Sequence, residues 1–94
     1  MDKLRDDGMD CLFKAVLTLE NIDECYDFFE DICTVKELKS IAQRFVVAKM
    51  LTEKRVYSDI VAETGASTAT ISRVNRSLSY GNDGYQMVFE RMKK

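Results

Sequence analysis

The spacing of apolar side chains predicts helices along the whole chain. Apolar residues recur at intervals of three and four positions, which place them on one face of an α-helix. No segment shows the alternation of a half-buried strand, and the 94 residues include no proline and only four glycines. We therefore predict an all-α fold.

The helix boundaries follow from the same pattern and from capping residues. Helices are expected over residues 7–19 and 22–33, and a long third helix over residues 34–52 opens with the capping-box pair Thr34 and Glu37. A last amphipathic helix closes the chain. The expected inner positions are Val35, Leu38, Ile41, Ala42, Phe45, Ala48 and Leu51 in the long helix and Tyr85, Val88, Phe89 and Met92 in the last one.

Residues 57–78 have the pattern of a helix-turn-helix. A short helix is followed by Gly65, which permits the positive φ of a tight turn, and by Ser67, whose hydroxyl can cap the next helix. The expected inner residues are Ile60, Val61 and Thr64 in the first of these two helices and Ile71, Val74 and Leu78 in the second.

The outer face of the second helix favours DNA binding. Residues 67–76 contain no Lys, Asp or Glu, although a solvated structural helix usually carries strong helix formers such as Glu and Lys outside. Instead they supply hydroxyls, a methyl group and arginines, which can contact base edges and phosphates in a major groove. The alternative is a structural corner of two helices, in which the hydroxyls only cap.

Charge is divided unevenly along the chain. Residues 1–33 hold ten acidic and three basic side chains, whereas residues 34–94 hold six acidic and eleven basic ones. The chain is slightly acidic as a whole, which by itself argues against a nucleic-acid partner. The basic part can nevertheless be steered onto DNA while the acidic part is repelled by it.

The length fits a single domain over residues 1–94, with residues 1–33 serving as dimerisation helices. The second helix carries apolar side chains on more than one narrow stripe, more than one neighbour can cover in a small monomer. A second copy of the chain would cover them, and a helix at the centre of a monomeric bundle is the alternative. These side chains are Ile22, Cys25, Tyr26, Phe28, Phe29, Ile32 and Cys33.

Several function classes are not indicated by the residues present. Three widely spaced cysteines without any histidine predict no metal site and no cofactor, and we expect reduced core thiols. No carboxylate lies beside a nucleophile or a phosphate-binding glycine loop, so we expect no enzyme. The charged amino terminus and short apolar runs predict neither a secretory leader nor a membrane span, and hence a cytoplasmic location.

Three features carry a resemblance to a known family: Thr34 at the start of the long helix, Gln43-Arg44 within it, and residues 65–73. From Thr34 onward the chain resembles the Trp repressor family, and more closely its YerC/YecD-like branch, for which a tryptophan-operon role need not hold. The resemblance implies an intertwined homodimer. Its two helix-turn-helix segments, which would read the DNA, lie about 34 Å apart, the length of one turn of DNA.

The resemblance also implies two sets of site residues. The DNA-binding set is Ser58, Thr68, Ala69, Thr70, Ser72, Arg73 and Arg76. The set for a small effector, which is tryptophan in the family, is Thr34, Arg44, Arg73 and Ser77. Val74 stands where the tryptophan-binding members carry glycine, and its branched side chain would occupy space that the indole needs. The resemblance therefore implies an effector other than tryptophan, or no effector, with Arg44 and Arg73 paired to carboxylates or phosphates.

Taken together, the sequence predicts a homodimeric, sequence-specific transcriptional regulator that binds double-stranded DNA and acts as a repressor. The alternative is a helical protein-interaction module that docks a partner through its acidic amino-terminal half and does not bind DNA.

Overall fold

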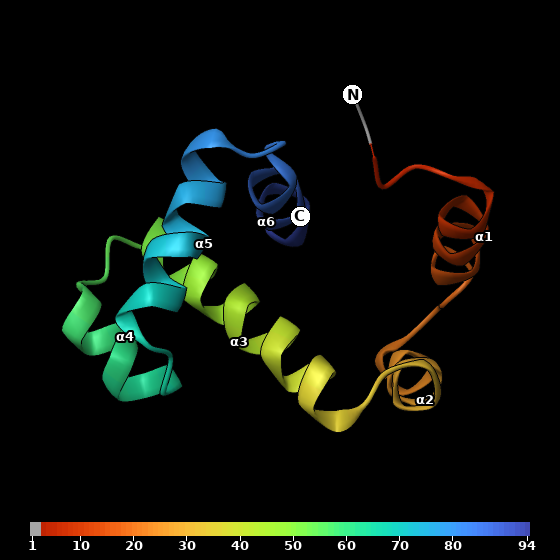
Figure 1. Ribbon diagram of the computed structural model, residues 1–94, viewed down its shortest axis with the longest axis horizontal. Coiled ribbons are helices and arrows are strands. Elements are labelled where there is room, and N and C mark those ends of the chain that lie inside the picture. Colours follow the sequence, from red (N-terminus) through yellow and green to blue (C-terminus); the bar gives the residue numbers. More distant parts are fainter. Residues whose placement is uncertain (1–2) are drawn as a thin grey trace. The chain divides into compact units, whose positions relative to one another are not determined.

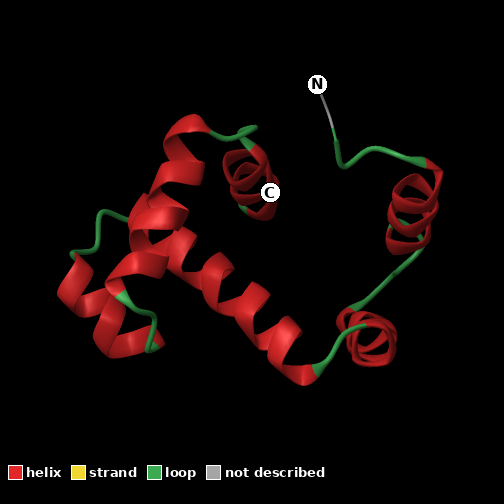
Figure 2. Cartoon of the chain, in the orientation of Figure 1, coloured by secondary structure: helices red, strands yellow, loops and turns green. Residues whose placement is uncertain are grey.

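The computed structural model describes residues 3–94, which form two compact units, the described residues up to 35 and residues 36–94. Six helices and their connecting loops account for these described residues (Figure 1 and Figure 2), so the predicted all-α class is confirmed. The helices are α1 (Asp7–Val16), α2 (Ile22–Ile32), α3 (Val35–Thr52), α4 (Tyr57–Thr64), α5 (Thr68–Tyr80) and α6 (Gly84–Met92).

Side-chain caps begin both helices of the first unit. The Asp6 carboxylate accepts a hydrogen bond of 2.7 Å from the Met9 N–H at the start of α1. At the start of α2, the Asn21 side chain accepts one of 2.9 Å from the Glu24 N–H, and the Glu24 carboxylate accepts one from the Glu20 N–H. These bonds satisfy amide groups that have no partner inside the helix, and they fix where each helix begins.

The end of α1 differs from the sequence prediction. The helix ends at Val16 instead of continuing to Leu19. The Thr18 hydroxyl donates a 2.6 Å hydrogen bond to the Ala15 carbonyl, and the Leu19 N–H closes a tight turn on the Val16 carbonyl. A hydroxyl that takes a backbone carbonyl in this way competes with helix continuation.

The first unit has no interior of its own. None of its described residues is buried, and Leu17, Ile22 and Tyr26 are 84%, 73% and 59% exposed. The cysteines are free thiols, but the prediction that they are core residues is wrong, because Cys11 and Cys25 are exposed and Cys33 is only partly buried. The apolar side chains of α1 and α2 therefore remain available to another surface.

The second unit contains the hydrophobic core. Its buried residues come from α3, α4, the turn between α4 and α5, and α5, and they are Val47, Ala48, Met50, Ile60, Ala66, Ile71 and Val74. Partly buried Leu51, Leu78, Tyr85 and Phe89 pack against this cluster. The core therefore joins both helices of the predicted helix-turn-helix to the carboxyl-terminal half of α3.

The predicted inner stripe of α3 is only partly correct. Ala48 is buried as expected, but Val35 and Ile41 are 69% and 47% exposed, and the buried Val47 and Met50 were not predicted. The prediction assigned one continuous stripe to the whole helix. In the structure the buried residues of α3 all lie in its carboxyl-terminal half, so its first turns leave their apolar residues uncovered.

An aromatic cluster and one hydrogen bond attach α6 to the rest of the second unit. The Phe45 ring of α3 lies 5.1 Å from the Phe89 ring and 6.4 Å from the Tyr85 ring. The Gln86 side chain donates a 2.7 Å hydrogen bond to the Leu78 carbonyl near the end of α5. The hydrogen bond lies at the end of α5 remote from its first turn, where Thr68 and Ala69 are exposed.

Candidate nucleic-acid interface

The turn between α4 and α5 has the geometry that the sequence predicts. Gly65 adopts a left-handed conformation with φ of 72°, and its N–H donates to the Val61 carbonyl at 2.9 Å. The Ser67 hydroxyl accepts a 3.1 Å hydrogen bond from the Thr70 N–H and so caps α5. Buried Ala66 lies between them and anchors the turn to the core. The turn thereby fixes the direction in which α5 begins.

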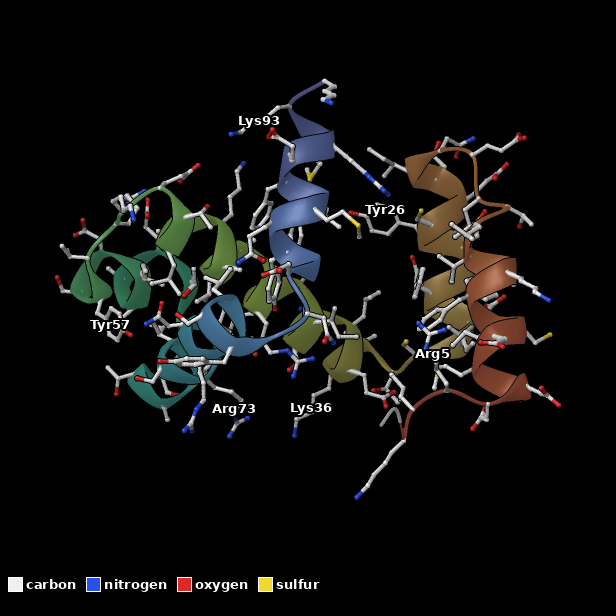
Figure 3. The ribbon with its side chains drawn as sticks, turned by 90° about the horizontal axis from the view of Figure 1, so that it is seen from above. Arg5, Tyr26, Lys36, Tyr57, Arg73 and Lys93 are labelled. Carbon is white, nitrogen blue, oxygen red and sulfur yellow. The ribbon has the colours of Figure 1, made fainter. Side chains whose placement is uncertain are left out.

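The two faces of α5 differ as expected. Ile71 and Val74 are 0% and 2% exposed and form part of the core. The exposed predicted DNA-binding residues of this helix are Thr68, Ala69, Ser72, Arg73 and Arg76. Figure 3 shows the Arg73 side chain projecting away from the ribbon of α5. The helix therefore presents hydroxyls, a methyl group and two arginines outward, and it has no acidic residue in its first turn.

Two further predicted positions have different surroundings. Thr70 is partly buried, and its hydroxyl accepts a 3.1 Å hydrogen bond from the Ser67 hydroxyl, so this side chain belongs to the cap. Ser58 lies exposed in the first turn of α4.

The prediction of an inner position for Val61 is wrong, because this residue is 37% exposed, whereas Ile60 is fully buried and Thr64 partly so. The short helix thus attaches to the core along a narrower stripe than predicted.

Three polar contacts of α4 were not predicted from the sequence. The Gln43 side chain of α3 donates a 3.1 Å hydrogen bond to the Thr64 carbonyl at the end of α4. Before α4, the Arg55 guanidinium lies 2.5 Å from the Glu63 carboxylate and 3.9 Å from that of Asp59. The four-residue spacing of Arg55 and Asp59 is the only signal in the sequence for these contacts. The first contact joins α4 to α3, and the other two join α4 to the loop that follows α3.

The predicted effector residues are distributed over both units. Thr34 lies in the first unit, directly before α3, and Arg44, Arg73 and Ser77 lie in the second. Arg44 is partly buried, whereas Arg73 and Ser77 are exposed on α5. Val74 directs its side chain into the core and is 2% exposed. The space beside Arg73 on the inner side of α5 is therefore occupied by a packed side chain.

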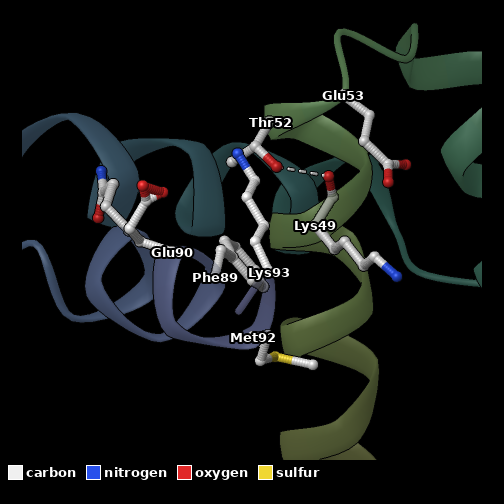
Figure 4. A pocket seen from close by; sticks show the side chains of 8 residues that line it. Lys49, Thr52, Glu53, Phe89, Glu90, Met92 and Lys93 are labelled. Atoms are coloured by element: carbon white, nitrogen blue, oxygen red, sulfur yellow. Dashed lines mark hydrogen bonds between the residues drawn. The ribbon is translucent and has the colours of Figure 1, made fainter.

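A separate hollow of about 520 Å³ lies between the end of α3 and α6 (Figure 4). Phe89 and Met92 provide its apolar part, and Lys49, Glu53 and Lys93 are among the charged residues around it. None of the predicted site residues lines it. Within residues 3–94 there is no group of His, Cys, Asp or Glu side chains that could hold a metal ion.

Comparison with known proteins identifies the family. The family model described as Trp repressor protein matches residues 7–93. The chain belongs to the Trp repressor family. This is a family of regulators without catalytic activity, so the prediction that the protein is not an enzyme is confirmed. The six helices correspondingly form a Trp-repressor-like fold.

Individual relatives support the same assignment over nearly the whole chain. Protein YerC of Bacillus subtilis (strain 168) is 54% identical over 94 residues, which cover 100% of this chain and 90% of YerC. The crystal structure of a TrpR-like protein from Eubacterium eligens ATCC 27750 is 63% identical, with a TM-score of 0.94, and covers 97% of this chain and 94% of that one. A crystal structure from Staphylococcus aureus is 57% identical, also with a TM-score of 0.94, at 97% and 91% coverage. The predicted resemblance to the Trp repressor family is confirmed.

Among residues 3–94, no helix combines the length and the apolar content that a transmembrane span requires.

Proposed function

We propose that this protein is a cytoplasmic, sequence-specific DNA-binding regulator that acts as a homodimer and represses transcription by occupying promoter DNA. The observation that carries the proposal is the outward face of α5. This face is exposed, lacks acidic side chains in its first turn and belongs to a helix whose inner residues are fixed in the core. Such a helix can enter a major groove without any rearrangement of the fold.

Four exposed residues of α5 have side chains suited to contact with DNA. The Thr68 hydroxyl can pair with a base edge, and the Ala69 methyl can contact a thymine methyl. Arg73 and Arg76 can neutralise phosphates. Thr70 would act mainly by supporting the cap of α5, because its hydroxyl is already bonded to Ser67. Ser58 adds a short hydroxyl from α4.

Two substitutions test these roles, and a third serves as the control. The DNA is a genomic fragment library titrated with the protein at several salt concentrations, from which one preferred and one non-preferred fragment are chosen. Thr68→Val should lower the preference by about 1–3 kcal/mol, because it removes a hydroxyl and keeps the shape. Arg73→Gln should weaken binding to both fragments and lower the salt slope by about one.

Arg91→Gln is the matched control, because Arg91 is exposed on α6 and the change removes the same charge. It should leave both the preference and the salt slope as in the unchanged protein. Retention of fragments without any preference, unaffected by the changes at Thr68 and Arg73, would refute sequence-specific binding by α5.

A second proposal concerns the small effector. We infer that the protein does not bind tryptophan tightly, because the side chain of Val74 is packed beside Arg73 where an indole ring would need space. Arg44 and Arg73 then serve carboxylate or phosphate partners, or a smaller effector that also contacts Ser77.

A further inference from the structure

A side-chain hydrogen bond attaches the carboxyl-terminal end of α4 to α3. The Gln43 amide donates to the Thr64 carbonyl at 3.1 Å, and both residues are partly buried. Side chains do not fill the space between α3 and α4 around this bond. A hollow of about 420 Å³ lies there, lined by Lys39, Ala42, Gln43, Val46, Glu63 and Thr64. A polar bond beside an open hollow has no surrounding packing to replace it if it is lost.

Two other kinds of contact hold α4: the ion pairs that Glu63 and Asp59 make with Arg55 in the loop after α3, and an apolar contact one turn before Thr64. Ile60 is fully buried in the cluster that includes Val47 of α3. The Arg55–Glu63 pair is solvent-exposed, with Glu63 54% exposed, and it reaches only the loop, so neither it nor one buried side chain fixes the direction of α4 relative to α3. The attachment at Thr64, four residues after Ile60, fixes that direction because hydrogen bonds are directional.

Only residues 65–67 separate Thr64 from the start of α5, so the position of Thr64 affects where α5 begins. The Thr64 hydroxyl donates to the Ile60 carbonyl at 2.7 Å and accepts from the Ala66 N–H at 3.1 Å. Gly65 and Ser67 complete the turn, and α5 begins at Thr68. A displacement of the Thr64 carbonyl would therefore move the amino-terminal turn of α5, which carries the exposed Thr68 and Ala69.

We propose that Gln43 is a positioning residue that fixes the angle of α4 and α5 on α3 and thereby the geometry in which α5 meets DNA. The part concerning DNA rests on the proposed function, whereas the part concerning helix orientation does not. Gln43 acts through the Thr64 carbonyl, and its side chain need not touch the nucleic acid.

The test compares two substitutions of the same kind. Gln43→Met and Gln86→Met each replace an amide by an apolar side chain of similar length, and each removes one donor to a backbone carbonyl. The Gln86 bond joins α6 to the end of α5, away from the turn. Residual dipolar couplings of the full-length protein report the directions of α4 and α5 relative to α3. Binding to the preferred and non-preferred fragments reports the preference at a temperature where all variants are folded.

Gln43→Met should change the couplings of α4 and α5 relative to α3 and lower the ratio of preferred to non-preferred affinity by roughly five- to tenfold. Gln86→Met should leave both quantities unchanged. Gln43→Lys, which retains a donor on a chain of comparable length, should keep the couplings of the unchanged protein. This third variant also serves if Gln43→Met does not fold.

Unchanged couplings in Gln43→Met would overturn the proposal, whether or not the preference falls. A lost preference with unchanged couplings would mean that Gln43 acts directly on DNA. If the unchanged protein shows no preference for any fragment, the proposed function fails, and the couplings alone still decide whether Gln43 sets the orientation of the helices.

Discussion

At the scale of single residues, Val74 connects packing with ligand choice. Its side chain is 2% exposed and belongs to the same buried cluster as Ile71 and Val47. Protein interiors are densely packed, so a planar ring could enter only by displacing this side chain, at a cost of about 1–3 kcal/mol or more. The neighbouring Arg73 remains exposed and chemically able to bind an anion.

We therefore expect no saturable binding when L-tryptophan is titrated into the protein to concentrations on the order of 1 mM, measured by isothermal titration calorimetry. DNA affinity measured with and without tryptophan should be the same. Saturable binding in the micromolar range would show that the core yields around Val74 and would contradict this expectation.

At the scale of elements, the turn between α4 and α5 depends on one backbone conformation. Gly65 has φ of 72°, and a Cβ added there would meet no atom within 4 Å. An alanine here would therefore destabilise the fold only because the left-handed backbone conformation costs about 1–2 kcal/mol for a residue with a Cβ. The smaller entropy of the unfolded chain partly offsets this cost. We expect Gly65→Ala to lower the free energy of unfolding by about 1 kcal/mol, measured by urea denaturation.

Gly84→Ala provides the matched control for this change. Gly84 lies at the start of α6, also has no atom within 4 Å of an added Cβ, and does not have a positive φ. Its replacement should leave stability unchanged or raise it slightly, because alanine favours helix. Equal effects at Gly65 and Gly84 would show that the turn tolerates a side chain in this conformation.

The elements also show what sequence could and could not predict. The cap at Ser67 and the positive φ at Gly65 were predicted correctly because each depends on residues only a few positions away. The exposure of Val61 and the burial of Met50 were not, since they depend on which part of α3 packs against α4 and α5. The Gln43–Thr64 bond spans 21 positions, and no local pattern indicates it.

At the scale of the whole molecule, the two units differ in how far their apolar side chains are buried. Residues 36–94 contain a core of their own, whereas the described residues up to 35 bury nothing while exposing Phe13, Leu17, Ile22, Tyr26 and Ile32. Exposed apolar side chains concentrated in two helices are typical of an association surface. The predicted homodimer would cover them, and a different protein partner is the alternative.

We expect the protein to sediment as a dimer, at twice its chain mass of 10.8 kDa. Replacing both Ile22 and Tyr26 by aspartate should shift it to monomer, because burying an apolar side chain contributes about 1.5–3 kcal/mol and an unpaired carboxylate cannot be buried cheaply. With two copies at the interface, the dissociation constant should rise by at least about 100-fold.

Replacing the exposed Asp27 of the same helix by asparagine should leave the dimer intact if apolar burial holds it together. Circular dichroism would confirm that the aspartate variant keeps its helices. A monomeric unchanged protein at micromolar concentration would contradict the homodimer and favour the protein-interaction alternative. In that case no second helix-turn-helix would be held one DNA turn away, and a single α5 would have to supply all of the sequence preference.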